Sequence, residues 1–400
     1  MAIRKKYTEL INHIPKKEFT ILIGARQIGK STLQKQIADS LIAQGESVYS
    51  INLERKNVLQ ELDQDPENLF KYCPLADGKK IFIMIDEIQY LKDASGFLKL
   101  LYDEYADRVK IFATGSSAFY IDKDFKDSLA GRKRIFRMPT LDFDEFLDFK
   151  GKPELLSELY SLQKGEKQKS VYENIFWALL DEYLNYGGYP AVVLENDFAG
   201  KKELLKEIRD SYIKRDILES GVSDQDKLYR LLMVLASQSG NLLNVNELSN
   251  TLRMNNSTIE SYLYILQKCF HISLVRPFYQ NLRKELIKMP KIYLNDLGLR
   301  NILINYFAPI GQRADKGVLL ENYVFRKLVE KHEPDQVRFW RTTDGNEVDF
   351  VVETSFRKGY AVEVKFQENE SKLSKYKTFI AAYPDFPLQI WHWENMILLL

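Results

Sequence analysis

Residues 19–31 read Phe-Thr-Ile-Leu-Ile-Gly-Ala-Arg-Gln-Ile-Gly-Lys-Ser, an apolar run followed by the pattern G-x-x-x-x-G-K-[ST]. The apolar run predicts a short buried strand, and the sequence from about Ser31 to Gln44 predicts a helix. Glycines let such a loop wrap closely around phosphate oxygens, while backbone amides and the helix N-terminus meet the negative charge. The stretch therefore predicts a phosphate-binding loop for ATP, in which Lys30 reaches the β- and γ-phosphates and Ser31 binds Mg²⁺. The residues predicted to bind ATP are Gly24, Ala25, Arg26, Gln27, Ile28, Gly29, Lys30, Ser31 and Thr32.

A second apolar run, Ile81–Ile85, is followed directly by two acids, Asp86 and Glu87. An apolar strand that ends in Asp places a carboxylate beside Mg²⁺, so we expect Asp86 to share the metal with Ser31. Glu87 is then placed to polarise the attacking water as a catalytic base. The strand predicted at Val48–Leu53 separates these two strands in sequence, as in ATPases that carry an extra catalytic Glu.

Two more positions are candidates for catalysis. Ser116 lies in Thr114–Ser117, after a fourth predicted strand, where a polar side chain can sense the γ-phosphate. The alternative is an ordinary strand-ending turn. Arg132, in the basic turn Leu129–Arg134, is a candidate arginine finger for the nucleotide of a neighbouring subunit. That role implies a homo-oligomer, and the alternative is a solvated basic turn.

Apolar strands alternate with helical patterns in the first part of the chain. This predicts an α/β fold with a parallel sheet covered by helices on both faces. The chain has 400 residues, of which 45% are hydrophobic and 28% charged, and its net charge of +1 carries no overall signature for nucleic acid. We find no apolar run near the ~20 residues that span a bilayer, and no secretory signal. The two cysteines form no metal-binding pattern, so we expect a cytoplasmic protein without a membrane partner.

The middle of the chain contains two helical patterns, Val245–Leu252 and Thr258–Lys268, around a tight turn. This arrangement resembles a helix-turn-helix, and Val275–Phe278 could then begin a wing. A small surplus of basic residues in this region makes DNA a candidate partner. A winged helix that contacts a protein partner is an equally open alternative.

The last part of the chain carries acids in a pattern that could hold a metal ion. Glu321 lies on a predicted helix, Asp349 on a predicted strand, and Glu363 and Lys365 on a further strand. Residues two apart on a strand face the same side, so Glu363 and Lys365 should project together. These four residues are the candidate nuclease site, because converging acids could bind Mg²⁺ and activate water for phosphodiester cleavage. A nuclease fold retained for binding alone is the alternative.

Taken together, these motifs resemble the prokaryotic AAA-type ATPases of the archaeal-ATPase-like group. The resemblance implies an AAA-like core with a helical subdomain, a winged helix and a C-terminal restriction-endonuclease-like (PD-(D/E)xK) α/β domain, but it implies no substrate. It rests on Gly24–Ser31, Ile85–Gln89, Thr114–Ser117, Leu129–Arg132, Tyr186–Pro190, Lys291–Leu299, Gly317–Asn322, Phe339–Thr342, Glu347–Phe350 and Glu363–Lys365, which span nearly the whole chain.

We therefore expect a P-loop ATPase core at 1–141, a helical lid subdomain at 142–226, a winged helix at 227–290 and a PD-(D/E)xK-like domain at 291–400. Within these, residues 151–165 are expected to be flexible and residues 290–313 to form a connector. The leading hypothesis is ATP hydrolysis with Mg²⁺ that drives an action on DNA, extended by metal-dependent cleavage. The alternative is a nucleotide switch, in which ATP gates contacts with a protein partner and the nuclease-like domain does not cut.

Overall fold

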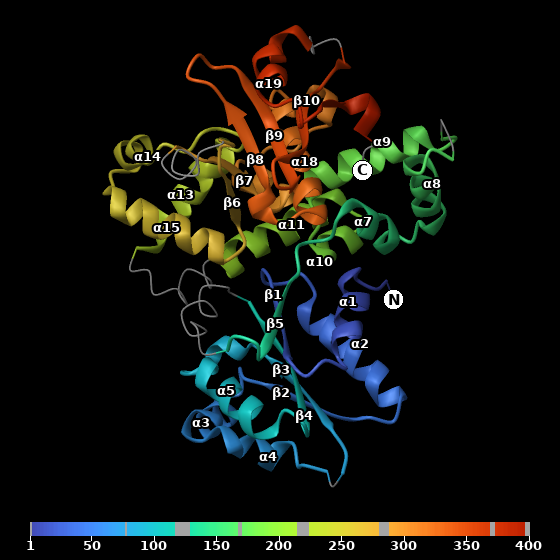
Figure 1. Ribbon diagram of the computed structural model, residues 1–400, viewed down its shortest axis with the longest axis vertical. Helices are drawn as coiled ribbons and strands as arrows, with labels where there is room; N and C mark the ends of the chain where they lie inside the picture. The colour runs from blue at the N-terminus through green and yellow to red at the C-terminus, as the bar shows by residue number, and fades with distance from the viewer. Residues whose placement is uncertain are drawn as a thin grey trace. The chain divides into compact units, whose positions relative to one another are not determined.

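The computed structural model in Figure 1 describes residues 2–76, 78–116, 129–166, 170–213, 224–279, 288–368 and 373–396. The chain divides into two compact units, residues 1–140 with 268–270 and residues 141–267 with 271–400. Among the described residues, none of the helices combines the length and the apolar character needed to cross a bilayer.

The first unit is built on a five-stranded sheet with the order β2-β3-β4-β1-β5, in which each neighbouring pair is parallel. The α/β fold with a parallel sheet is thus confirmed. Its elements are α1 (Lys6–His13), β1 (Phe19–Ile23), α2 (Lys30–Ala43), β2 (Ser47–Asn52), α3 (Lys56–Gln64), α4 (Leu69–Tyr72), β3 (Ile81–Asp86), α5 (Ala94–Tyr105), β4 (Val109–Gly115) and β5 (Lys133–Arg137).

Helices cover both faces of this sheet. Phe19, Ile21 and Ile23 of β1 share a buried apolar cluster with side chains of α3 and α5. On the opposite face lies α2 (Figure 1). There the Gln34 amide of α2 donates to the carbonyls of Ile85 and Phe112 at 3.2 and 3.0 Å, which ties the helix to β3 and β4. Because all strands are parallel, their carboxyl ends lie at one edge of the sheet, where α/β proteins bind their ligands.

The order of the strands places β4 between β1 and β3. The sequence shows only that Val48–Leu53 lies between the other two along the chain. In space that segment, β2, is the edge strand beyond β3, and β4 separates the phosphate-loop strand from the strand that ends in Asp86.

The second unit begins with helices and ends in a mixed sheet. Its elements are α7 (Phe143–Phe149), α8 (Pro153–Gln163), α9 (Glu173–Tyr186), α10 (Pro190–Leu194), α11 (Phe198–Glu207), a π-helical segment (Ile208–Ile213), α13 (Gln225–Ser237), α14 (Val245–Leu252), α15 (Asn256–Lys268), β6 (Ile272–Val275), β7 (Lys291–Leu294), α17 (Leu297–Leu303), α18 (Lys316–Lys331), β8 (Val337–Arg341), β9 (Glu347–Ser355), β10 (Lys358–Lys365), α19 (Lys377–Ala382) and β11 (Leu388–His392).

Two sheets organise the second unit. Strands β6 and β7 pair antiparallel. The larger sheet has the order β11-β10-β9-β8, with β8, β9 and β10 antiparallel and β11 parallel to β10 (Figure 1). Its apolar side chains share a core with those of α9 and α18, which fixes the helix that carries Glu321 against the sheet that carries the other acids.

Two expectations about the connections were wrong. Residues 151–165, expected to be flexible, contain α8, because Leu155, Leu159 and Leu162 recur at helical spacing and are buried. Residues 290–313, expected to be a connector, contain β7 and α17. The expected domain boundary at 290/291 consequently falls between the paired strands β6 and β7.

Candidate functional site

The loop between β1 and α2 has a backbone that requires glycine at two positions. Gly29 has a φ of +93°, in the left-handed region that other residues rarely adopt. A Cβ on Gly24 would lie 2.3 Å from the carbonyl oxygen of Met138, so no side chain fits there. The loop therefore turns sharply at its end and passes close to the chain after β5, and α2 begins at Lys30.

Two basic side chains hold this loop. Lys30 is buried, and its Nζ donates to the carbonyls of Gly24 and Ala25 at 2.9 and 2.7 Å. Arg4, also buried, donates from Nη1 to the Ile28 carbonyl at 2.7 Å and from Nη2 to the Pro139 carbonyl at 2.8 Å. The sequence offers no signal for Arg4, because its position in a short basic stretch suggests only a solvated terminus.

The two predicted magnesium ligands lie together at the carboxyl edge of the sheet. The Ser31 hydroxyl donates to the Asp86 carboxylate, with Oγ 3.2 Å from Oδ1 and 3.0 Å from Oδ2. The Thr114 hydroxyl, at the end of β4, also donates to Asp86 Oδ1. Sequence reasoning chose Ser116 and not Thr114 from the segment Thr114–Ser117, because Thr114 becomes a neighbour of Asp86 only through the order of the strands. A hydroxyl and a carboxylate are ligand types that Mg²⁺ accepts, so this arrangement fits the metal.

The predicted base Glu87 lies next to these groups. Its backbone has a φ of +60°, and its N–H lies 3.3 Å from Thr114 Oγ1, which accepts the hydrogen bond. The Gln89 amide donates both to the Glu87 carboxylate and to Ser116 Oγ, the latter at 2.8 Å. Arg26 Nη1 lies 3.9 Å from Glu87 Oε1. Glu87 and the buried Ser116 are thus brought together through Gln89, which sequence reasoning did not select.

Arg132 lies at the other edge of the sheet. Its carbonyl accepts a hydrogen bond of 2.9 Å from Phe19 N, at the start of β1, whereas the phosphate loop begins after the end of that strand. The length of β1 therefore separates Arg132 from the phosphate loop by about 13 Å, at ~3.3 Å per residue. The guanidinium forms a two-bond ion pair with Asp103 of α5, at 2.6 and 3.2 Å. Arg132 is therefore not part of the site within one chain, and its role toward a neighbouring subunit stays a prediction.

The strand-loop-helix that encloses Lys30, with Ser31 and Asp86 paired at the carboxyl edge, defines a P-loop nucleotide-binding domain. Comparison with known families gives the same class: residues 16–147 match the model of a family described as "AAA domain". This part of the chain is thus similar to AAA-type ATPase domains. Residues 178–309 and 316–392 match two families described as domains of unknown function (DUF8612 and DUF4143).

Relatives extend over most of the chain. An uncharacterized protein of Haemophilus influenzae is 28% identical over 366 residues, which covers 88% of this chain and 84% of the relative. An uncharacterized protein of Methanocaldococcus jannaschii is 27% identical over 388 residues, 94% of this chain and 81% of the relative. Their names supply no activity.

Solved structures resemble the chain only distantly. The ORC2 protein of Aeropyrum pernix in its ADP form is 13% identical with a TM-score of 0.34, over 75% of this chain and 90% of that one. The replication initiator DnaA bound to AMPPCP and single-stranded DNA is 14% identical with a TM-score of 0.32, over 65% and 86%. Scores this low support no argument about function.

The second unit brings together the four candidate nuclease residues. Lys365 forms an ion pair with Glu363 on β10, as their spacing predicts. Asp349 of β9 accepts a hydrogen bond of 2.9 Å from Val364 N, and its own N–H lies 3.3 Å from Glu363 Oε2. Glu321 of α18 lies close enough to Asp349 for the charges of the two carboxylates to interact. Burial and the nearby Asp349 carboxylate raise the pKa of Glu321 to about 7, and the same two causes raise the pKa of Glu363 to about 7.

Two further residues of this cluster, Lys291 and Glu347, lie in motifs that carry the resemblance but were not selected from the sequence as nuclease residues. Lys291 Nζ lies 2.9 Å from Glu321 Oε1, 2.6 Å from Glu347 Oε1 and 3.6 Å from Asp349 Oδ1. Burial lowers the pKa of Lys291, but the charges of Glu321, Asp349 and Glu347 outweigh burial and raise this pKa above the ordinary value for lysine. We call these six residues, Lys291, Glu321, Glu347, Asp349, Glu363 and Lys365, the acid cluster.

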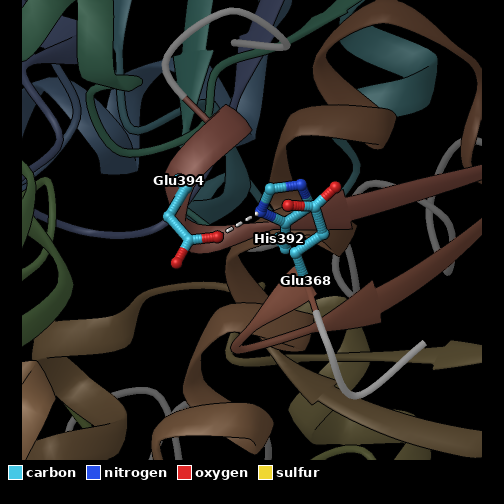
Figure 2. Close-up of side chains that lie close together, drawn as sticks. All are labelled: Glu368, His392 and Glu394. Carbon is cyan, nitrogen blue, oxygen red and sulfur yellow. Dashed lines mark ion pairs between the residues drawn. The ribbon is translucent and has the colours of Figure 1, made fainter.

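A second group of potential metal ligands lies near β11. The ligand atoms of Glu368, His392 and Glu394 are all within 4.8 Å of one another, and His392 Nδ1 lies 3.0 Å from Glu394 Oε2 (Figure 2). His392 is paired in register with Lys365 of β10. Sequence reasoning assigned no metal role to the histidines, because the partners of His392 come together only in the folded sheet. Glu368 and Glu394 are exposed, and exposed acids often lie close together without a metal.

Proposed function

We propose that the AAA-type domain hydrolyses ATP with Mg²⁺, and that the chain uses this hydrolysis to act on DNA. The contact of Ser31 Oγ with Asp86, at 3.0 Å and directly beside Glu87, is the observation that supports hydrolysis best. Ser31 and Asp86 would hold Mg²⁺, which neutralises phosphate charge when bound. When ATP is bound, Lys30 would donate to phosphate oxygens in place of the Gly24 and Ala25 carbonyls.

Glu87 would take the proton from the attacking water. Gln89 orients the carboxylate of Glu87, and Thr114 holds its backbone. Glu87 is therefore already positioned, and it loses little conformational freedom when the transition state forms. Ser116, held by the same Gln89 amide, would sense the γ-phosphate. These roles are part of the proposal, as is an arginine finger supplied in trans by Arg132 within an ATP-dependent oligomer.

The proposed action on DNA draws on α13, α14 and α15 followed by the antiparallel pair β6–β7, the element order of a winged helix. Asn244 caps α14 by accepting hydrogen bonds from Asn246 N and Glu247 N, at 3.1 and 3.3 Å. Arg253 ends α14 in the left-handed conformation and begins the turn toward α15. Val275–Phe278, the segment expected to begin a wing, pairs with β8, since the Phe278 N–H donates to the Phe339 carbonyl, and residues 280–287 lie outside the described part of the chain.

Metal-dependent cleavage at Glu321, Asp349, Glu363 and Lys365 is an extension of this proposal. The alternative function is a nucleotide switch for protein contacts, with a nuclease-like domain that does not cut. The observation that favours the switch is that the Lys291 ammonium lies among the carboxylates that would have to bind a metal.

The rate of ATP hydrolysis, measured with and without duplex and single-stranded DNA at low salt, tests the proposal. A DNA-acting ATPase should be stimulated by DNA, and a variant such as Glu87→Gln should remain slow in its presence. Hydrolysis that no DNA alters, together with no DNA binding at low salt, would leave the nucleotide switch as the better explanation.

A further inference from the structure

One cation of the acid cluster comes from outside the sheet that carries most of its acids. Lys291 lies on β7, and its side chain is 3% exposed. Its ammonium has three N–H donors and reaches three carboxylates, those of Glu347 at 2.6 Å, Glu321 at 2.9 Å and Asp349 at 3.6 Å. The three donors equal the three carboxylates in number, and the ammonium lies between these acids.

A divalent cation at the same oxygens would lie very close to this ammonium. Mg²⁺ sits at ~2.0–2.1 Å from its oxygen ligands, so a Mg²⁺ bound to Glu321 Oε1 would lie at most about 5 Å from Lys291 Nζ. In a buried site, two cations at that separation repel each other strongly. The Lys291 ammonium and a divalent metal therefore compete for Glu321 and Asp349.

Two of these carboxylates have further protein donors. The Tyr293 hydroxyl donates to Glu321 Oε1 at 2.6 Å, and Val364 N donates to Asp349 Oδ2 at 2.9 Å. Lys365 neutralises Glu363. A metal at Glu321 Oε1 or Asp349 Oδ2 would compete with these donors as well as with Lys291.

The strand β7, which carries Lys291, is hydrogen-bonded to the segment between α13 and α14. β7 pairs with β6 on one side, and Ile292 exchanges hydrogen bonds of 2.7 and 3.1 Å with Gly240 N and the Asn241 carbonyl on the other. The strand that carries Lys291 thus belongs to the part of the second unit that we propose as the DNA-contacting element. The strand is also tied to α18, because Leu294 and Asn322 exchange hydrogen bonds of 3.0 and 2.9 Å, and the ammonium is thus held beside the acids.

We propose that the Lys291 ammonium is the resident cation of the acid cluster and competes there with a divalent metal. The inference rests on the proposal that Glu321, Asp349 and Glu363 form a metal site. It adds that a basic side chain on β7 competes with the metal for carboxylates on α18 and β9.

The test is Mn²⁺ binding, measured on the full chain by calorimetry and by the loss of free-Mn²⁺ electron paramagnetic resonance, without nucleotide. The test variant is Lys291→Gln combined with Glu347→Gln, which removes one positive and one negative charge and keeps the three candidate ligands. The matched control is Glu347→Gln alone, which keeps the ammonium. We expect the double variant to bind Mn²⁺ at least about tenfold more tightly than the wild type and the control. Adding Asp349→Asn to the double variant should abolish the gain.

If the wild type binds Mn²⁺ as tightly as the double variant, and Asp349→Asn removes that binding, Lys291 does not compete with the metal and only this inference fails. If the double variant is folded by circular dichroism but binds no Mn²⁺, the cluster is not a metal site, and the proposed nuclease activity fails with the inference. Should the double variant not fold, Lys291→Met, which keeps most of the apolar stem, provides the same comparison.

Discussion

Replacement of Thr114 by valine tests the ATPase site most directly. Thr114 is fully buried, donates its hydroxyl hydrogen to Asp86 and accepts the N–H of Glu87 at 3.3 Å. Valine has nearly the same volume but no hydroxyl, so it removes one of the hydrogen bonds that orient Asp86, the carboxylate proposed to bind Mg²⁺. A hydrogen bond to a charged group contributes about 1.5–3 kcal/mol, and a loss of that size in the transition state lowers the rate roughly 10–150-fold.

Phosphate release, measured over a range of ATP and Mg²⁺ concentrations, gives kcat/KM for this variant. We expect Thr114→Val to lower kcat/KM by about 10–100-fold, while ATP binding without metal changes little, because Lys30 and the loop are untouched. Thr114→Ser is the matched control, since it keeps the hydroxyl and should stay near wild type. Thermal unfolding of both variants shows whether the fold is intact. Hydrolysis by a folded Thr114→Val within about twofold of wild type would refute the reasoning, because the hydroxyl would then be dispensable for Asp86.

The remaining predictions concern the same domain and its partners. Lys30→Ala should abolish tight ATP binding in a fluorescent-nucleotide titration, whereas Glu87→Gln should bind ATP and hydrolyse it about 10²–10⁴ times more slowly. Wild-type turnover by Glu87→Gln would show that another group is the base. Arg132→Ala mixed with Lys30→Ala should recover part of the ATPase activity, since a finger from one subunit would complete the intact loop of another. A monomer in light scattering at every nucleotide condition would contradict this. The chain should bind labelled duplex DNA weakly, and its affinity should fall as the salt concentration rises. Arg253→Ala should reduce the slope of log K against log salt by about one unit. The same slope for wild type and variant would remove Arg253 from the interface.

The sequence alone determined the phosphate loop and the general class of the first unit. Gly24 to Ser31 is one contiguous stretch, so its backbone requirements are local and can be read without knowing where the rest of the chain goes. Asp86 could also be predicted, because an apolar run that ends in an acid specifies a strand and the edge at which its side chain emerges. The positions of the other strands in the first unit could likewise be predicted from their short apolar runs.

The tertiary structure decided which side chains meet. Thr114 contacts Asp86 because β4 lies between β1 and β3, and the order of strands in a parallel sheet depends on how crossover helices pack, which hydrophobic periodicity does not encode. The same topology places Arg132 at the edge opposite the phosphate loop. Lys291 looked like part of a connector, yet pairing of β6 with β7 carries its ammonium into a cluster of acids drawn from α18 and β9. A buried charge finds its partners through packing over long sequence separations, and only the folded chain shows that these carboxylates already hold a cation.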